Sequence, residues 1–283
     1  MSEKQARRAR QQARARRAAL AAREAQAGER ERSLDSLSHR RKLAWAGFHT
    51  DEVEAIIQEW VDDGGYRVFQ EPDGQGGSRL MAEMLKPLPD ELGLIIGDGL
   101  QALRNSLDNL AFALARAHTP VMSPSDERQV SFPIFDNAAA VGAAQIKLME
   151  IGAQKTVCDL CPDPNQAPVD QHPLWLLNKT ANRDKHREIH VVAVGYGVRN
   201  MRAGSGYISS LTTYNQLLQP GEPAKPIVEV GAGTTMNMYM SHGLHIAFAK
   251  GVEVEDREVV PTLRWFHDHI RDTVFQRLEP HLT

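Results

Sequence analysis

Apolar side chains recur at alternating steps of four and three residues in the second quarter of the chain. They are Ile96, Leu100, Leu103, Leu107, Leu110 and Leu114. Such steps place side chains on one face of an α-helix, and a continuous seam of large aliphatic groups is typical of a helix that packs along another helix. The sequence therefore predicts a helix over 96–115 with one buried face.

Periodicity elsewhere predicts both helices and strands. Further helices are expected at 42–62, 138–151, 173–188 and 259–278. Strands are expected at 66–70, 79–85, 189–194, 236–240 and 244–248. The first two strands flank a turn-rich segment and should form a hairpin, and the last two can form another. Helices come early and late with strands between them, so we predict an α+β fold in which helices pack on a small, mostly antiparallel sheet.

Charge is unevenly distributed along the chain. Residues 1–42 hold thirteen Lys and Arg against five Asp and Glu, a net charge of +8, whereas the remainder carries -11. The basic side chains at the start are Arg7, Arg8, Arg10, Arg14, Arg16 and Arg17. Because they alternate with Ala and Gln and have no apolar stripe, residues 1–40 are predicted to be a disordered arm or a fraying helix. Residues 41–283 are predicted to be a single α+β domain.

A basic arm attracts phosphates through counterion release, so nucleic acid or another anionic partner is one expectation. The other is a solvated tail that binds nothing. No run approaches the ~18 apolar residues of a membrane span, and the Arg-rich start lacks the apolar centre of a signal peptide. With only two cysteines, Cys158 and Cys161, the chain is expected to be cytoplasmic with reduced thiols.

Two of the expected helices carry polar stripes beside their apolar faces. The first stripe is Asp98, Gln101, Asn105 and Asp108, with Arg104 one turn from Asp108. The second is Asn178, Asn182 and His186, flanked by Asp184, Lys185 and Arg187. If the two stripes meet, they form either a hydrogen-bonded network that fixes how the helices dock or an anion site. Its ligand groups would come from Asn178, Asn182, Lys185 and Arg187.

Three motifs in and around these helices resemble a family of uncharacterised bacterial and phage-associated proteins. They are GD-x-L-x-x-LR-x-x-LD-x-L at 97–110, S-FPIF at 131–135 and HPLWLLN-x-x-x-N-x-DKHR at 172–187. The resemblance covers most of residues 43–280 and implies no established activity. Family members often have histidine where this chain has Asn109, and the arm and the cysteine pair lie outside the family pattern.

The spacing of Arg104 to Asn109 resembles the Arg-x4-6-His motif of the HEPN ribonuclease superfamily, whose helical members cleave RNA without metal. That resemblance implies a phosphate-binding arginine and an acid-base histidine, a role that Asn109 cannot fill. Arg183 and His190 match the spacing, as do two other pairs, which is about the number that chance predicts. If the protein is such an enzyme, its catalytic candidates are Arg104, Asp108, Arg183, His186 and His190.

Metal and cofactor chemistry has weaker support in the sequence. Cys158 and Cys161 form a single CxxC, and even with His172 as a third ligand a zinc site would lack a fourth. Gly195 and Gly197 follow a strand without the third glycine of a dinucleotide-binding motif. We therefore predict no metal and no cofactor.

The sequence favours a non-enzymatic binding or interaction protein. It leaves two alternatives open, a HEPN-like metal-independent ribonuclease or abortive-infection toxin and a nucleic-acid-associated accessory protein that uses the basic arm. It also leaves a homodimer open.

Overall fold

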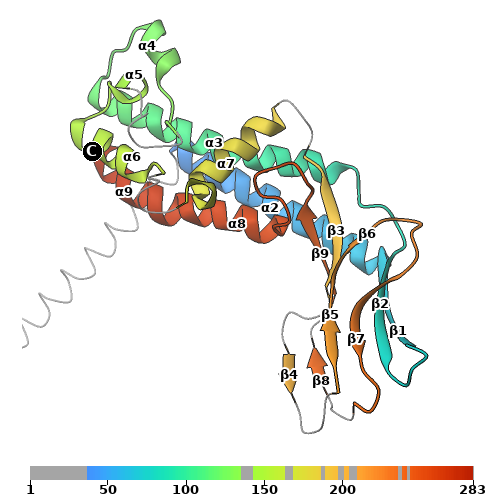
Figure 1. The fold of residues 1–283 in the computed structure, drawn as a ribbon. Coiled ribbons are helices and arrows are strands. Elements are labelled where there is room, and N and C mark those ends of the chain that lie inside the picture. Colours follow the sequence, from blue (N-terminus) through green and yellow to red (C-terminus); the bar gives the residue numbers. More distant parts are fainter. Residues whose placement is uncertain are drawn as a thin grey trace, which may run out of the picture.

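The computed structural model describes residues 37–134, 143–162, 168–185, 189–196, 201–203, 209–234, 238–240 and 243–282. The α+β prediction is confirmed: helices gather on one side of the molecule and small antiparallel sheets on the other (Figure 1). Nearly all of the predicted arm falls outside the described residues, as do 138–142 of one predicted helix. Within the described ranges, no helix is long and apolar enough to cross a membrane.

Four helices form the helical layer. They are α2 (Ser38–Asp62), α3 (Glu91–His118), α7 (Pro173–Asp184) and α8 (Val259–His269). Both α3 and α8 run antiparallel to α2, because Ser38 contacts Asn109 of α3 while His39 contacts Phe275 beyond the end of α8. The helix after α8 continues as a π-helical stretch, Ile270–Phe275, and as α9 (Gln276–Leu278). The C-terminal helix predicted at 259–278 is thus confirmed with a π-helical segment inside it.

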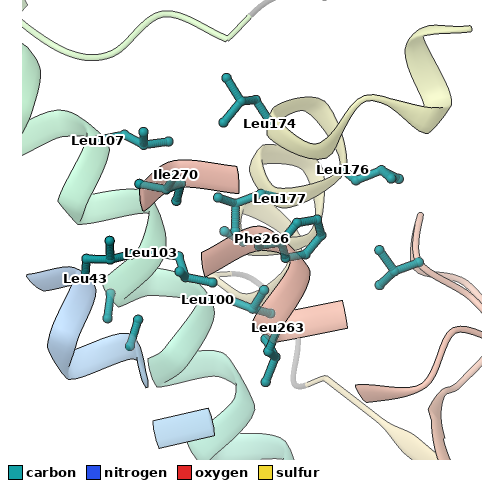
Figure 2. Close-up of a cluster of buried hydrophobic side chains, with 14 of the residues drawn as sticks. Leu43, Leu100, Leu103, Leu107, Leu174, Leu176, Leu177, Leu263, Phe266 and Ile270 are labelled. Atoms are coloured by element: carbon teal, nitrogen blue, oxygen red, sulfur yellow. The ribbon is translucent and has the colours of Figure 1, made fainter. Parts of the chain in front are cut away.

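The apolar seam predicted for α3 is the centre of the core. All six of its leucine and isoleucine side chains are buried, with no more than 1% of their surface exposed. Figure 2 shows three of them, Leu100, Leu103 and Leu107, among side chains from α2, α7 and α8 that include Leu43, Leu177 and Phe266. Burying a side chain of this size contributes about 1.5–3 kcal/mol, so the seam accounts for much of the stability of the helical layer.

Within the described ranges, the strands form three sheets. The largest contains, in order, β1 (Tyr66–Pro72), β2 (Ser78–Met84), β7 (Lys225–Val230) and β5 (Leu211–Thr213). The second contains β6 (Asn215–Leu218), β3 (Val191–Tyr196) and β9 (Gly243–Phe248). The third pairs β4 (Met201–Ala203) with β8 (Met238–Met240). The predicted β1–β2 hairpin is confirmed, and its register pairs Tyr66 with Met84.

The predicted hairpin of 236–240 with 244–248 is wrong in its pairing. Strands exist at both places, but β8 pairs with β4 and β9 pairs with β3, so they belong to different sheets. Alternating side chains predict that a segment is a strand but not which partner it takes, because pairing depends on the surfaces that the rest of the fold presents.

The segment between α3 and α7 holds short helices: α4 (Pro124–Gln129), α5 (Ala143–Ile146), α6 (Ile151–Leu160) and η2 (Val169–Gln171). The helix predicted at 138–151 is therefore wrong in extent. Its described part ends at Ile146, and α6 starts where the Glu150 side chain accepts a hydrogen bond from the amide of Ala153. That N-cap satisfies an amide that a continuous helix would have bonded internally.

Candidate functional site

The polar stripes of α3 and α7 do meet, and Arg104 is the centre of the contact. Its Nε donates to Asn178 Oδ1 of α7 at 3.1 Å, and one terminal nitrogen donates to Asp108 at 2.7 Å. The other terminal nitrogen donates to the carbonyl of Phe132 at 2.8 Å, and the Phe132 amide donates back to Asp108 at 2.9 Å. One guanidinium thus joins α3, α7 and the 131–134 segment, with 12% of its side chain exposed.

A second contact lies one turn earlier on α3. Gln101 Nε2 donates to the carbonyl of Ala181 at 2.5 Å and to Asp184 Oδ2 at 3.3 Å. Gly97 lets the helices approach here, since a Cβ atom at this position would lie 2.4 Å from the Asp184 carboxylate. Burial raises the pKa of Asp184, a hydrogen bond from Gln101 lowers it in part, and the charge of Asp98 raises it further.

The raised pKa of Asp184 predicts a stabilising substitution. Because folding disfavours its charged form, stability is greatest when Asp184 is protonated and falls as pH rises through the folded pKa. Its place at the C-terminal end of α7 adds repulsion from the helix dipole. We expect Asp184→Asn, which keeps an acceptor for Gln101, to raise stability at pH 7 by less than about 1 kcal/mol. Thermal melts at pH 7 and in acid check this, because the gain should vanish once Asp184 is protonated.

The exposed Asp51 is the control, since Asp51→Asn is expected to change stability by no more than about 0.5 kcal/mol at either pH. A melt in which Asp184→Asn is destabilising at pH 7 would contradict this reading of the contact.

The other polar residues of the two stripes that the structure describes lie outside the hydrogen bonds of Arg104 and Gln101. Asn105 and Asp98 are exposed, and Asn182 accepts a bond at 3.4 Å from Lys185 within its own turn. Asn109, at the position where the resembling family often has histidine, donates to Ser38 Oγ of α2 at 2.9 Å. Of the three predicted ligand groups that the structure describes, Asn178, Asn182 and Lys185, only Asn178 therefore contacts Arg104.

The other catalytic candidates that the structure describes, Arg183 and His190, lie outside the Arg104 network. Arg183 is half-buried at the end of α7, with its guanidinium near Gly251, and His190 is exposed just before β3. The predicted site residues His186 and Arg187 lie outside the described residues, as do the arm residues Arg7, Arg8, Arg10, Arg14, Arg16 and Arg17. Helix α7 ends at Asp184, about a turn before the end predicted for it.

Among the described residues, the cysteines and histidines do not converge on a metal site. Cys161 is buried and donates to the Pro133 carbonyl at 3.4 Å, while burial raises the pKa of the Cys158 thiol. His172 instead caps α7, where its Nδ1 accepts from the Leu174 amide at 3.2 Å. In the part of the chain that the structure describes, no three His, Cys, Asp or Glu side chains are placed to hold a metal ion.

His172 also contacts His269, a pairing that no local sequence pattern predicts. The rings of His172 and His269 lie edge to face, with centroids 6.0 Å apart. Burial lowers the pKa of His172, and burial together with the charge of His172 lowers the pKa of His269 to about 4. Both rings are therefore neutral near pH 7 and behave as core-edge groups between α7 and α8.

A buried ionic cluster near the C-terminus was missed from the sequence. Glu279 accepts hydrogen bonds from Arg40 at 2.6 and 2.7 Å and contacts His39 Nε2 at 3.0 Å. Burial alone would raise the pKa of Glu279, but the bonds and charges of Arg40 and His39 outweigh it and lower the pKa to about 2. About 240 residues separate the partners, so no local signal could have joined them.

A cavity of about 550 Å³ opens between α2, β9 and the start of α8. Glu54, His245, Glu258 and Arg264 line it along with apolar side chains. The Arg264 guanidinium already pairs with Glu54 and Asp51, and the His245 ring stacks on Tyr196. The polar groups at its wall are thus largely committed to the protein itself.

Comparisons of the chain with protein-family models, with curated proteins and with solved structures find no match. The assignment of function therefore depends on the chemistry of the described residues and on the sequence of the arm.

Proposed function

We propose that this protein is a non-enzymatic interaction protein that binds an anionic partner through its basic arm. The observation that carries the proposal is the hydrogen bonding of Arg104, the arginine that a ribonuclease would use to bind phosphate. Each of its three guanidinium nitrogens donates to an acceptor of the protein, so this arginine docks α7 and the 131–134 segment onto α3. A group held in this way is a structural element rather than a phosphate ligand.

Charge segregation supports the anionic partner. Residues 1–42 carry a net charge of +8 and the rest of the chain carries -11. The basic run continues onto the first turns of α2, where Arg41 and Lys42 are exposed. Because residues 43–283 are negatively charged, they repel phosphates, so an anionic partner should bind only the arm. Its affinity should depend steeply on salt concentration.

The test compares the full chain with two variants of the arm. In one, the six arginines at positions 7, 8, 10, 14, 16 and 17 are replaced by glutamine, and in the matched control by lysine. With a labelled RNA and a labelled DNA duplex as probes, we expect the glutamine variant to lose at least about tenfold in affinity at low salt. The lysine variant should keep the salt dependence, because the counterion term depends on charge and not on guanidinium geometry. Equal binding by all three chains would overturn the proposal, and so would the absence of binding by the full chain at low salt.

The same RNA probe also distinguishes the ribonuclease alternative from an interaction protein. Cleavage that persists in a chelator and is lost in His186→Ala or in His190→Ala would favour a HEPN-like enzyme over an interaction protein. Intact RNA after prolonged incubation is the outcome that the proposal expects.

A further inference from the structure

The outer face of α2 carries an exposed stripe with the spacing of a helix–helix seam. Its members follow one another at steps of four and three residues: Arg41, Trp45, Phe48, Glu52, Ala55 and Glu59. All of them are exposed except Glu52, which is half-buried. The opposite side of α2 already packs on α3 and α8, so this stripe is a second seam of the same helix on which no described helix packs.

Two large aromatic side chains stand out of this stripe. Trp45 is 52% exposed and Phe48 is 53% exposed, and their rings stack with centroids 5.1 Å apart. The edge of the Trp45 ring also meets His49, which is buried behind it. The pair is therefore a preformed apolar ridge whose exposed half would gain about 25 cal/mol for each Å² removed from water.

The charges around the ridge exclude a nucleic acid lying along α2. Basic residues occupy only its start, whereas the exposed side chains beyond Phe48 are acidic at Asp51, Glu54, Glu59 and Asp62. A phosphate backbone extending along the helix would meet this acidic half. The occupant should instead be acidic where α2 is basic and basic where α2 is acidic.

A second copy of α2 has that pattern if it runs in the opposite direction. We propose that the α2 stripe pairs antiparallel with the same stripe of a second copy. With the two-fold axis between Phe48 and Glu52, Arg41 lies opposite Glu59 of the second copy, and the large Trp45 lies opposite the small Ala55 of the second copy. A parallel pair would place Arg41 against Arg41 and Glu59 against Glu59, which like-charge repulsion disfavours.

This arrangement gives a closed, two-fold interface about 37 Å long, the length of the 25-residue helix. Each arm ends where its α2 begins, so the antiparallel pair would carry its two basic arms at opposite ends of the interface. The dimer does not depend on the anion-binding proposal, since it can form whether or not the arms bind anything.

The first test is the mass of the full chain in solution, measured by sedimentation velocity from about 1 to about 100 µM. We expect a concentration-dependent shift from 31.5 kDa towards about 63 kDa. Phe48→Asp and Trp45→Asp should each abolish the shift without unfolding the protein, because both side chains are half exposed. The matched control is Leu94→Asp at a 63% exposed position on α3, which should leave the shift unchanged.

The second test fixes the direction and register of the pair. Arg41→Glu and Glu59→Arg should each weaken the dimer at least about tenfold, and the double variant that exchanges the two charges should restore it. A monomer at every concentration would overturn the proposal, as would a dimer that survives Trp45→Asp. A double variant that stays monomeric would overturn the antiparallel register. If deletion of residues 1–36 creates a dimer that the full chain lacks, the arm and not a second copy covers the stripe, and the proposal fails for the intact protein.

Discussion

Replacing Glu279 with alanine is expected to lower the free energy of unfolding by about 3 kcal/mol. The carboxylate has 9% of its side chain exposed and binds both Arg40 and His39, whose side chain is 1% exposed. Removing it takes the carboxylate contact from the buried His39 imidazole and two hydrogen bonds from the Arg40 guanidinium, which is the costly way to break a buried pair. Urea unfolding of the variant against the wild type at pH 7 measures the loss.

The pH dependence provides a second readout of the same cluster. The pKa of Glu279 falls from 4.5 to about 2 on folding, so its contribution is present above pH 4.5 and is lost as pH falls towards 2. The difference between wild type and Glu279→Ala should therefore shrink across that window. As a control, Asp159→Ala breaks an exposed ion pair with Arg277 and should cost less than about 0.5 kcal/mol. A difference that stays constant down to pH 2 would show that Glu279 does not act through its charge.

Replacing Arg104 with alanine is the second substitution with a large expected effect, about 3 kcal/mol. Its loss would remove the arginine donor from three acceptors: Asn178 Oδ1, the Asp108 carboxylate and the Phe132 carbonyl. The 131–134 segment should also loosen, because Asp108, which accepts from the Phe132 amide, would lose the cation that orients it. Hydrogen exchange at that amide should rise together with the loss of stability in urea.

Arg104→Lys distinguishes the contribution of the forked guanidinium geometry to stability from the contribution of the positive charge. A lysine ammonium cannot reach acceptors on α3, α7 and the 131–134 segment in one geometry, so more than half of the loss should remain. Arg116→Ala, at a half-exposed position of α3 whose partner Glu127 is 3.9 Å away, should change stability by less than about 0.5 kcal/mol. If Arg104→Ala leaves stability unchanged, the network is not structural, and Arg104 becomes the first candidate for a phosphate ligand.

The sequence alone determined the elements whose signal is local. The apolar steps of α3 depend only on the 3.6-residue period of a helix, and the β1–β2 hairpin depends on a turn-rich segment between alternating runs. The meeting of the two polar stripes entered the sequence analysis only as a condition, and the structure meets it at Arg104, Asn178 and Gln101. Their spacing did not indicate that Phe132 completes the Arg104 cluster, since that contact comes from a loop.

Only the tertiary structure decided the contacts between segments far apart in the sequence. Glu279 meets His39, β8 pairs with β4 rather than β9, and Gly97 lets α7 approach α3. Periodicity specifies which face of an element is buried, because that choice is set by the backbone geometry of a few neighbouring residues. Which buried face meets which depends on packing and hydrogen-bond satisfaction over the whole chain, and those are properties of the assembled fold.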